Sequence, residues 1–324
     1  MHLLILGCSS IVRRRVLPAA AAVPAIGRVS VASRSRGAGV ADSFAGTDGP
    51  PLGWFRDYDE ALASSGADLV YVSGVNAAHA QWVLRALEHG RHVVVDKPAF
   101  PDLETAETAV RLARARGVGL AEATVFTWHP QAAALKALTD EAEAGATRAT
   151  ATFSFPPLPA GDFRYRAACG GGSLYDLGPY AAATNRLLFG TAPAAVHCAV
   201  LTRARGVDTS FSVLLTHAHG GSLAGHFGFV TAYRNRLSVL TRSRAMDADR
   251  VFTTPPDLAC ALRVREDRTD REVPIPAADA FARFLASFAA AAAGGGFEPF
   301  ERALLEDAAL VARLRRAAGL EKGT

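Results

Sequence analysis

The chain has 324 residues, of which 50% are hydrophobic and 20% are charged, and its net charge is +4 with acidic and basic residues interleaved. This length favours two domains, each able to bury a core, and the charge balance gives no indication of a nucleic-acid-binding surface. No apolar run approaches the roughly 18 residues that span a membrane. The apolar start of the chain is followed, not preceded, by arginines, which is unlike a secretory signal. We therefore expect a cytoplasmic protein that binds neither nucleic acid nor membranes.

The first third of the sequence alternates short β-branched runs with longer helical patterns. A parallel strand needs a crossover to reach its neighbour, so this alternation predicts an α/β domain with a doubly wound, parallel Rossmann sheet. A helical or loop stretch is expected up to about residue 60. The predicted strands are residues 2–7, 28–34, 67–73 and 92–98, and the predicted helices include residues 9–24, 77–90 and 103–117.

From about residue 148 the pattern changes to successive strand-like runs joined by short turns. Such runs predict an α+β domain with an open, mostly antiparallel sheet, in which only residues 170–190 and the tail from Ala278 are helical. We therefore predict a dinucleotide-binding domain at residues 1–122 and a substrate-binding, dimerising domain at residues 123–324, whose C-terminal helix is free to pack back on the first. The strand-like runs are residues 147–155, 194–204, 209–219, 222–233, 236–243 and 249–255.

The cysteines and histidines give no indication of a metal site. Four cysteines are widely spaced and form no CxxC pair, so free thiols are the simplest interpretation. His217 and His219 lie on one face of a predicted strand, but no third ligand stands nearby in the sequence. We predict no bound metal. The cysteines are Cys8, Cys169, Cys198 and Cys260.

The first strand ends in Gly7, which fills the first position of a dinucleotide-binding fingerprint. The other two glycine positions hold Ser9 and Val12, so the match is incomplete, and an ordinary strand–turn–helix is the alternative. Ser9 is small enough for the backbone to approach a phosphate, and the following helix would direct its N–H groups at a pyrophosphate. The predicted cofactor turn is Gly7, Cys8, Ser9, Ser10 and Ile11, with Arg14 beside it.

The end of the second strand bears on which cofactor binds. Enzymes that use NAD place an acid here to hold the ribose 2′-hydroxyl, whereas those that use NADP accommodate the 2′-phosphate with an arginine. This chain has no acid here but has Ser33 and Arg34, a hydroxyl and a guanidinium that together suit a phosphate. A solvated loop arginine is the alternative. We predict NADP(H) as the cofactor.

Lys97 is one of three lysines among 35 basic residues, and it follows the strand-like run HVVVD. A lysine amine can lose its proton when desolvated, whereas an arginine stays charged. Lys97 and other polar residues stand at the carboxyl ends of predicted parallel strands, where open α/β sheets bind ligands. Asp176 and Tyr180 are four residues apart in a helical segment and so lie on one face. A surface lysine before a turn proline is the alternative for Lys97.

Four motifs together resemble the glucose-fructose oxidoreductase / inositol dehydrogenase (Gfo/Idh/MocA) superfamily: GCSSI (7–11), DKP (96–98), WHPQ (128–131) and GGGSLYDLGPY (170–180). Two further stretches, GHFGFVTAYRNRL and DRVFTTPP, look like its branch of nucleotide-sugar ketoreductases from antibiotic sugar pathways. The resemblance covers nearly the whole chain. Asp96 stands where that family has Glu, and Val12 stands where it has a small residue.

The resemblance implies that Lys97 and Tyr180 flank the reacting carbon opposite the nicotinamide, with Asp176 beside them. Reduction of a ketone puts negative charge on oxygen, which calls for a proton donor and a nearby cation. A phenol beside an ammonium gives up its proton more readily, so the pair suits this chemistry. The other implied cofactor contacts are Ser73, Asn76 and His79. The other implied substrate contacts are Trp128, His129, Arg164, Tyr165 and Tyr233. Packing is the alternative for both histidines.

The resulting hypothesis is an NADPH-dependent oxidoreductase that reduces a keto group of a nucleotide-linked deoxysugar, at C3, in antibiotic biosynthesis. A dehydrogenase or reductase of a free sugar or cyclitol is the alternative within the same fold. A non-catalytic NADP-binding regulator is a third, which the presence of Lys97, Asp176 and Tyr180 disfavours. The runs at residues 209–219 and 222–233 carry apolar residues on both faces of their strands, so we expect the second sheet to form a homodimer or homotetramer.

Overall fold

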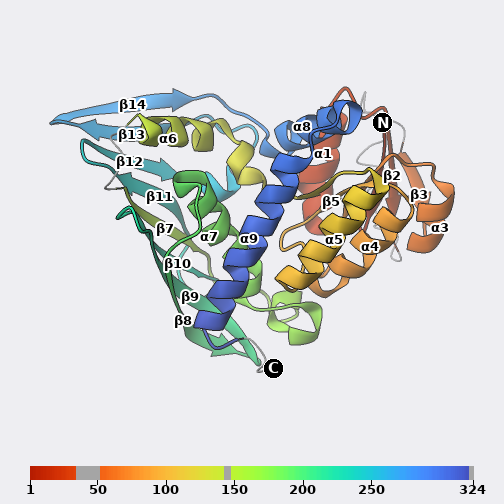
Figure 1. Ribbon diagram of the computed structural model, residues 1–324, viewed down its shortest axis with the longest axis horizontal. Helices are drawn as coiled ribbons and strands as arrows, with labels where there is room; N and C mark the ends of the chain where they lie inside the picture. The colour runs from red at the N-terminus through yellow and green to blue at the C-terminus, as the bar shows by residue number, and fades with distance from the viewer. Residues whose placement is uncertain (34–51, 142–146, 321–324) are drawn as a thin grey trace. The chain divides into compact units, whose positions relative to one another are not determined.

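The computed structural model describes residues 1–33, 52–141 and 147–320, and the chain divides into two units (Figure 1). Unit 1 comprises Met1–Ala123 and Phe281–Leu305, and unit 2 comprises Thr124–Ala280 and Glu306–Thr324. Unit 1 therefore takes residues from both sides of the predicted division after residue 122. Within the described ranges, no helix combines the length and the apolar character that crossing a bilayer requires.

Unit 1 is built on a parallel sheet of six strands in the order β3-β2-β1-β4-β5-β6. The strand order reverses between β1 and β4, which confirms the predicted doubly wound Rossmann sheet. The central strands are apolar on both faces, as burial under helices requires, and all of Leu3 to Leu6 are fully buried. The strands are β1 (His2–Leu6), β2 (Arg28–Ala32), β3 (Leu52–Phe55), β4 (Leu69–Val72), β5 (His92–Val95) and β6 (Leu120–Glu122).

The edge strand β3 lies where a helix or loop is expected, so that expectation is wrong at residues 52–55. The strand pairs in parallel with β2, with Ala32 opposite Phe55. Four residues are too few to show a strand periodicity, and glycine is depleted in strands. Gly53 is nevertheless favoured by packing, because a Cβ atom there would lie 2.6 Å from the Ser30 hydroxyl, which would have to move.

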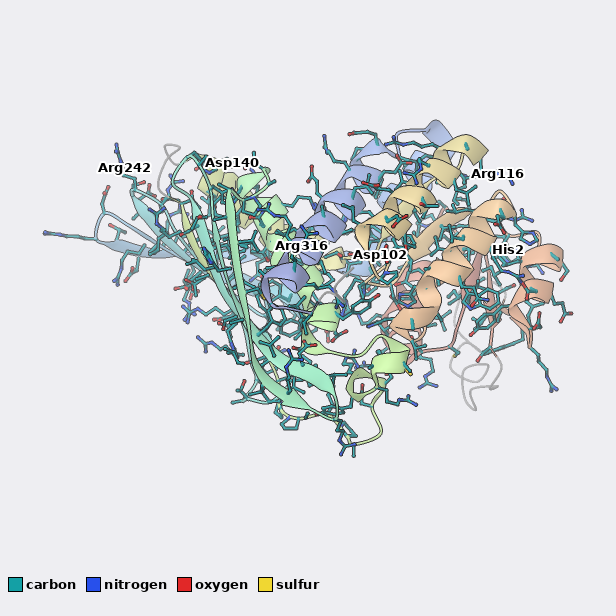
Figure 2. All side chains as sticks on the ribbon, turned by 60° about the horizontal axis from the view of Figure 1, so that its bottom comes forward. His2, Asp102, Arg116, Asp140, Arg242 and Arg316 are labelled. Carbon is teal, nitrogen blue, oxygen red and sulfur yellow. The ribbon has the colours of Figure 1, made fainter. Side chains whose placement is uncertain are left out.

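The helices of unit 1 connect its strands, and α4 (His79–Glu88) and α5 (Leu103–Arg116) pack side by side (Figure 1). Helix α5 begins where the Asp102 carboxylate accepts a hydrogen bond from the Thr105 N–H at 2.8 Å. Asp102 and Arg116 mark its two ends (Figure 2), an acidic start and a basic end that complement the helix dipole. The preceding helical segments are η1 (Val12–Val16), α1 (Leu17–Ala21) and α3 (Tyr58–Ser64).

Two helices follow at the C-terminal end of the chain, α8 (Ala280–Gly294) and α9 (Glu298–Ala317). In unit 1 the fully buried Phe288 ring meets the Phe300 ring edge-on, with the ring centroids 5.2 Å apart. The Arg114 guanidinium on α5 pairs with the buried Glu301 carboxylate at 2.7 Å. These contacts show that a segment remote in sequence completes the core of unit 1.

Unit 2 is built on a sheet of eight strands in the order β14-β13-β12-β11-β7-β10-β9-β8. Only the pairing of β10 with β7 is parallel, which confirms the predicted mostly antiparallel sheet. The strands are β7 (Arg148–Ser154), β8 (Ala195–Ala204), β9 (Val207–Thr216), β10 (Ser222–Gly228), β11 (Arg234–Leu240), β12 (Arg244–Asp249), β13 (Cys260–Glu266) and β14 (Thr269–Ile275).

The strand predicted at residues 249–255 is wrong, because this segment forms a 3-10 turn, η6 (Val251–Thr253). Arg250 has a φ of +56°, which an extended strand does not allow. The carboxamide oxygen of Asn235 accepts a hydrogen bond from the Phe252 N–H at 3.1 Å. Val251 and Phe252 are buried, so these apolar residues belong to the core although they lie in a turn.

Strands β12, β13 and β14 were not predicted, since charged residues interrupt their apolar pattern.

Two helices, α6 (Pro130–Asp140) and α7 (Ser173–Phe189), pack on one face of the sheet of unit 2 (Figure 1). The core between them and the sheet includes Phe211, Leu215 and Phe227. Because side chains alternate along a strand, the intervening residues lie on the other face. This outer face carries Ser212, Leu214, Ala224 and His226, of which Leu214 is 43% exposed.

Helix α7 begins after three glycines and is held there by the buried Asp208 on β9. The Asp208 carboxylate accepts hydrogen bonds from the Ser173 hydroxyl at 2.7 Å and from the Leu174 N–H at 2.6 Å. Gly172 has a φ of +117°, and a Cβ atom there would lie 2.5 Å from Oδ1 of Asp208. The carboxylate thus caps the helix from a distant strand, at a position that only glycine allows.

We expect Asp208→Ala to lower the free energy of unfolding by about 2–3 kcal/mol, because two donors lose their acceptor in a buried place. Asp102→Ala is the matched control, since Asp102 caps α5 at the surface with a single bond, and it should cost about 1 kcal/mol. Urea titration followed by circular dichroism measures both. Equal losses in the two variants would contradict the role given to Asp208.

Candidate active site

The turn after β1 meets the end of β4, and Gly7 makes this approach possible. Gly7 has a φ of +102°, and a Cβ atom there would lie 2.0 Å from the carbonyl oxygen of Ser73. The Ser9 hydroxyl is 2.8 Å from the Ser73 hydroxyl and accepts a hydrogen bond from the Val12 N–H at 3.2 Å. The following helix begins at Ser10, and the first N–H groups of a helix have no acceptor within it. The turn therefore fits the phosphates of a dinucleotide.

The side chains around this turn add positive charge and no reactive thiolate. The Arg14 guanidinium donates from Nε to the Ser10 hydroxyl at 3.0 Å. Burial raises the pKa of the Cys8 thiol, an effect that the charge of Arg13 partly opposes. Val12, which departs from the fingerprint, is fully buried. Its side chain therefore belongs to the core of unit 1.

The ends of β2 and β4 carry three more of the predicted cofactor residues. Ser33 is buried, and its N–H donates to the Phe55 carbonyl oxygen at 3.0 Å. Arg34 lies outside the described residues. Asn76 begins the 3-10 turn η2 (Asn76–Ala78), and His79 begins α4. The His79 ring is 1% exposed, and burial lowers its pKa although the Asp96 carboxylate opposes this. The neutral ring donates from Nδ1 to the Pro98 carbonyl oxygen at 2.8 Å.

Lys97 follows β5 and lies in a turn that is held on either side. The carboxylate of the preceding residue, Asp96, accepts hydrogen bonds from the hydroxyls of Tyr71 and Ser73. Beyond the cis peptide bond between Lys97 and Pro98, the Ala99 N–H donates to the Glu122 carboxylate at 2.8 Å. The structure thus brings Gly7, Ser9, Ser73 and Lys97 to the same edge of the sheet, where parallel strands of such folds bind ligands.

In unit 2 the helix α7 carries Asp176 and Tyr180, and Arg164 joins the first of them. Arg164 donates from Nε to the Asp176 carboxylate at 2.8 Å and lies 3.3 Å from the Asp162 carboxylate. Asp176 is 3% exposed. Burial lowers the pKa of Arg164, but the two carboxylates overcome this and raise it. The charge of Arg164 is therefore favoured by its two acidic neighbours, although the guanidinium is largely buried.

The Tyr180 ring lies half-buried among three other aromatic rings. It meets Phe153 edge-on with the centroids 5.0 Å apart, Phe252 at 5.5 Å and Phe126 at 5.9 Å. Rings that contact on several sides leave the side chain little rotational freedom. The phenol is thus presented from α7 with a fixed direction.

The other residues predicted to contact substrate are dispersed within unit 2. The His129 Nδ1 accepts a hydrogen bond from the Gln131 N–H at 3.1 Å, so His129 caps α6. The Tyr165 hydroxyl accepts one from the Leu158 N–H at 3.2 Å, and its ring packs on Phe229. Trp128 ends the 3-10 turn η3 (Val125–Trp128), and Tyr233 is 49% exposed beside the Arg250 guanidinium. The structure gathers Arg164, Asp176 and Tyr180, and gives His129 and Tyr165 packing contacts.

Sequence reasoning missed Tyr71, Glu122 and Asp208 as supports of this site. Tyr71 reads as an ordinary strand residue, and its partner Asp96 is 25 residues away. Asp208 was the better signal, because an acid beside a strand-like run needs a partner when it is buried. Which partner it finds depends on strand order, which the local sequence does not contain.

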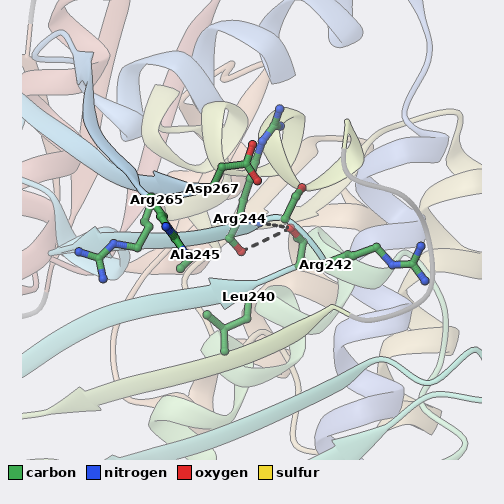
Figure 3. A pocket seen from close by; sticks show the side chains of 9 residues that line it. Leu240, Arg242, Arg244, Ala245, Arg265 and Asp267 are labelled. Carbon is green, nitrogen blue, oxygen red and sulfur yellow. Dashed lines mark hydrogen bonds between the residues drawn. The ribbon is translucent and has the colours of Figure 1, made fainter.

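A separate hollow of about 550 Å³ lies in unit 2 between the β11–β12 and β13–β14 turns (Figure 3). Two of the arginines that line it have acidic partners: Arg244 pairs with Glu266 at 2.7 Å, and Arg265 pairs with Asp270 at 2.6 Å. In the part of the chain that the structure describes, no group of three or more His, Cys, Asp or Glu side chains is arranged to hold a metal ion. The hollow contains none of the predicted site residues and is not a candidate active site.

Two family models match the chain and together span most of the described site. "Oxidoreductase family, NAD-binding Rossmann fold" matches residues 1–124, and "GFO/IDH/MocA C-terminal domain" matches residues 132–244. Among relatives, a dTDP-3,4-didehydro-2,6-dideoxy-alpha-D-glucose 3-reductase of Actinomadura kijaniata is 35% identical over 297 residues, which cover 90% of this chain and 87% of the relative. A D-xylose 1-dehydrogenase (NADP(+)) of Haloferax volcanii is 29% identical over 292 residues, which cover 90% of this chain and 89% of the relative.

The fold of a solved relative agrees with the sequence comparison. The crystal structure of a 3-ketoreductase from Actinomadura kijaniata in complex with NADP and TDP-benzene superposes with a TM-score of 0.89, at 32% identity and with 98% of each chain covered. The residues at the turn after β1 fit the dinucleotide that such a domain holds. The chain belongs to the GFO/IDH/MocA family and is an NAD(P)-dependent oxidoreductase whose Rossmann domain binds the cofactor.

Proposed function

We propose that this protein uses NADPH to reduce a keto group, at C3, of a nucleotide-linked deoxysugar. The observation that carries the proposal is the identity of 35–36% over 90–98% of the chain to two dTDP-3,4-didehydro-2,6-dideoxy-alpha-D-glucose 3-reductases, from Actinomadura kijaniata and Streptomyces violaceoruber. A free-sugar dehydrogenase is the second candidate, favoured by the xylose dehydrogenase at 29% identity. The higher identities support the nucleotide sugar, and they are the basis on which we propose a role in antibiotic sugar biosynthesis.

When bound, NADPH supplies the hydride that the carbonyl carbon accepts. The residues of this chain would supply the proton and the electrostatic stabilisation of the oxygen. Lys97 provides a positive charge for the developing alkoxide, and Tyr180 donates a proton to that oxygen, which balances the reduction to an alcohol. Solved structures of the Actinomadura ketoreductase include variants in which a lysine is replaced by alanine and a tyrosine by phenylalanine, residue types that suit these roles.

Arg164 and Asp176 would set the charge around the phenol. The Asp176 carboxylate is buried, is paired with Arg164 at 2.8 Å and lies one helical turn from Tyr180. A carboxylate here suits a hydrogen bond from a sugar hydroxyl. We assign further substrate contacts to Arg164, Trp128 and Tyr233, and cofactor contacts to the turn at Gly7–Ile11, to Arg14 and to Ser33, Ser73, Asn76 and His79.

The catalytic pair is tested by Lys97→Met and Tyr180→Phe. Each should lower kcat by about 10²–10⁴, as expected for positioned acid–base groups, while NADPH binding survives. The double variant should be far less impaired than the product of the single effects, because both residues serve one proton transfer. Lys136→Met is the control, since Lys136 is a surface lysine paired with Asp140 on α6, and it should keep full activity.

Single-turnover reduction of a 3-keto nucleotide sugar, followed by NADPH absorbance, separates the contributions. If Tyr180→Phe turns over within about threefold of the unmodified protein, tyrosine is not the acid and the role passes to Lys97 alone. Turnover of a free aldose with no turnover of the nucleotide sugar would favour the second candidate function.

The cofactor is tested by Arg34→Ala. If Arg34 and Ser33 hold the 2′-phosphate, the loss of a charge-assisted contact of about 1.5–3 kcal/mol should raise the KM for NADPH by roughly ten- to a hundredfold. The KM for NADH should hardly change, because NADH has no 2′-phosphate. An equal rise with both cofactors would refute the assignment.

We also propose that the outer face of the sheet of unit 2 joins two copies of the chain. Leu214 lies between His197 on β8 and Ala224 on β10, and Ala199, Ser212 and His226 form the next row. Apart from the two histidines, these side chains are short or apolar, which suits the approach of a second sheet. Light scattering should give a dimer or tetramer at micromolar concentration, and Leu214→Arg should shift it toward monomer. A monomeric unmodified chain would contradict the proposal.

A further inference from the structure

The Asp96 carboxylate joins the ends of β4 and β5. Oδ1 accepts a hydrogen bond from the Tyr71 hydroxyl, and Oδ2 accepts one from the Ser73 hydroxyl at 2.5 Å. Tyr71 and Ser73 are two residues apart along β4 and its extension, so their side chains lie on the same face. Each carboxylate oxygen therefore has its own donor from a single neighbouring strand.

The main chain completes the same junction. The Asp96 N–H donates to the carbonyl oxygen of Val72 at 2.9 Å, and Val72 stands between the two residues whose side chains bind the carboxylate. Asp96 is thus fixed by one backbone bond and two side-chain bonds around one residue of β4. Lys97 is the next residue along the chain, so the direction in which it leaves the sheet depends on this junction.

The Tyr71 hydroxyl is suited only to donate. The side chain is fully buried, and burial, with the nearby charge of Asp96, raises the pKa of Tyr71 well above its ordinary value. The raised pKa favours the protonated phenol, which is the form that donates to the carboxylate.

A second link runs from this junction to the turn after β1. The Ser73 hydroxyl that donates to Asp96 is 2.8 Å from the Ser9 hydroxyl, which in turn accepts from the Val12 N–H at 3.2 Å. The Ser73 N–H also donates to the Leu6 carbonyl oxygen at 2.8 Å. A continuous set of hydrogen bonds therefore connects the cofactor turn with the residue before Lys97.

We propose that Tyr71 and Asp96 are positioning residues that fix Lys97 relative to the cofactor turn, through the hydrogen bonds of Asp96 to Tyr71 and Ser73. The inference rests on the proposed function, because it takes Lys97 as the residue that acts on the ketone. Tyr71 and Asp96 then influence the rate without contacting the reacting atoms. A displacement of about 1 Å at a reacting group costs on the order of a hundredfold in rate.

Kinetics of Tyr71→Phe and Asp96→Asn provide the first test. Tyr71→Phe keeps the buried ring and removes one hydroxyl, so the fold should survive. We expect kcat to fall about ten- to a hundredfold, with the Kd of NADPH, from fluorescence quenching, within about threefold. Ser30→Ala is the matched control: Ser30 is also fully buried in the same sheet, and its hydroxyl lies 2.9 Å from Nε2 of His2. Its kcat should stay within about twofold.

A double-mutant cycle shows whether the two residues act through their shared bond. In the Asp96→Asn background, Tyr71→Phe should have much less effect on kcat than in the unmodified protein, because the contact is already weakened. Asp96→Glu retains the carboxylate and should recover part of the loss. Independent effects of the two substitutions, or full activity of Tyr71→Phe, would overturn the inference.

The scarcity of lysine allows a readout that needs no turnover. Reductive methylation with ¹³C-formaldehyde labels only three lysines, Lys97, Lys136 and Lys322, and the α-amine. Lys97→Arg identifies the Lys97 signal. We expect that signal to move in Tyr71→Phe and in Asp96→Asn, where loss of an adjacent negative charge also lowers the apparent pKa of the amine, and to stay in place in Ser30→Ala.

A Lys97 signal that is unchanged in both variants would overturn the positioning role, whatever happens to the rate. Failure of the proposed function looks different. In that case Lys97→Met would turn over at the unmodified rate, while the methyl signal of Lys97 would still respond to Asp96→Asn. The turnover of Lys97→Met therefore tests the proposed function, and the methyl signal of Lys97 tests the positioning role independently of it.

Discussion

The Asp96 carboxylate accepts hydrogen bonds from Tyr71 and Ser73 at the point where the parallel strands β4 and β5 end. A carboxylate that loses part of its hydration needs hydrogen-bond donors in its place, and the partly buried Asp96 finds two of them on the neighbouring strand and its extension. The demand fixes the register of the strand ends and the course of the chain through Lys97. It also connects that course with Ser9 and the turn after β1.

The same physical device recurs in unit 2 at two places. Asp208 caps α7 from β9, and Asp176 on α7 is paired with Arg164. The helix α7, which presents Tyr180, is therefore fixed at its first residues by the buried carboxylate of Asp208. It also carries a second buried carboxylate, that of Asp176. Such groups stabilise the fold little for their cost of dehydration, but they favour one arrangement over its alternatives because each misplaced neighbour leaves a buried charge unsatisfied. That selectivity suits residues whose direction determines a reaction.

Local sequence predicted much of the architecture because its signals act over short distances. The alternation at residues 2–117 indicated a parallel sheet, and the structure has it. The shorter runs after residue 148 indicated an antiparallel sheet. The sequence pattern failed in two places. Val251 and Phe252 are apolar and buried but lie in a turn, so their burial was mistaken for a strand. Strand β3 is too short to show a strand periodicity.

By itself the sequence determined which reactive and conformational residues are present and where they stand locally. These are a lysine after β5, a glycine after β1 where the chain must turn with positive φ, and an acid and a tyrosine on one face of α7. These follow from residue type and local spacing, which the chain carries directly. Only the tertiary structure decided that Tyr71 and Ser73 reach Asp96 and that Asp208 caps α7. Those assignments depend on strand order and long-range register, where residues up to 35 positions apart meet because the whole sheet has formed.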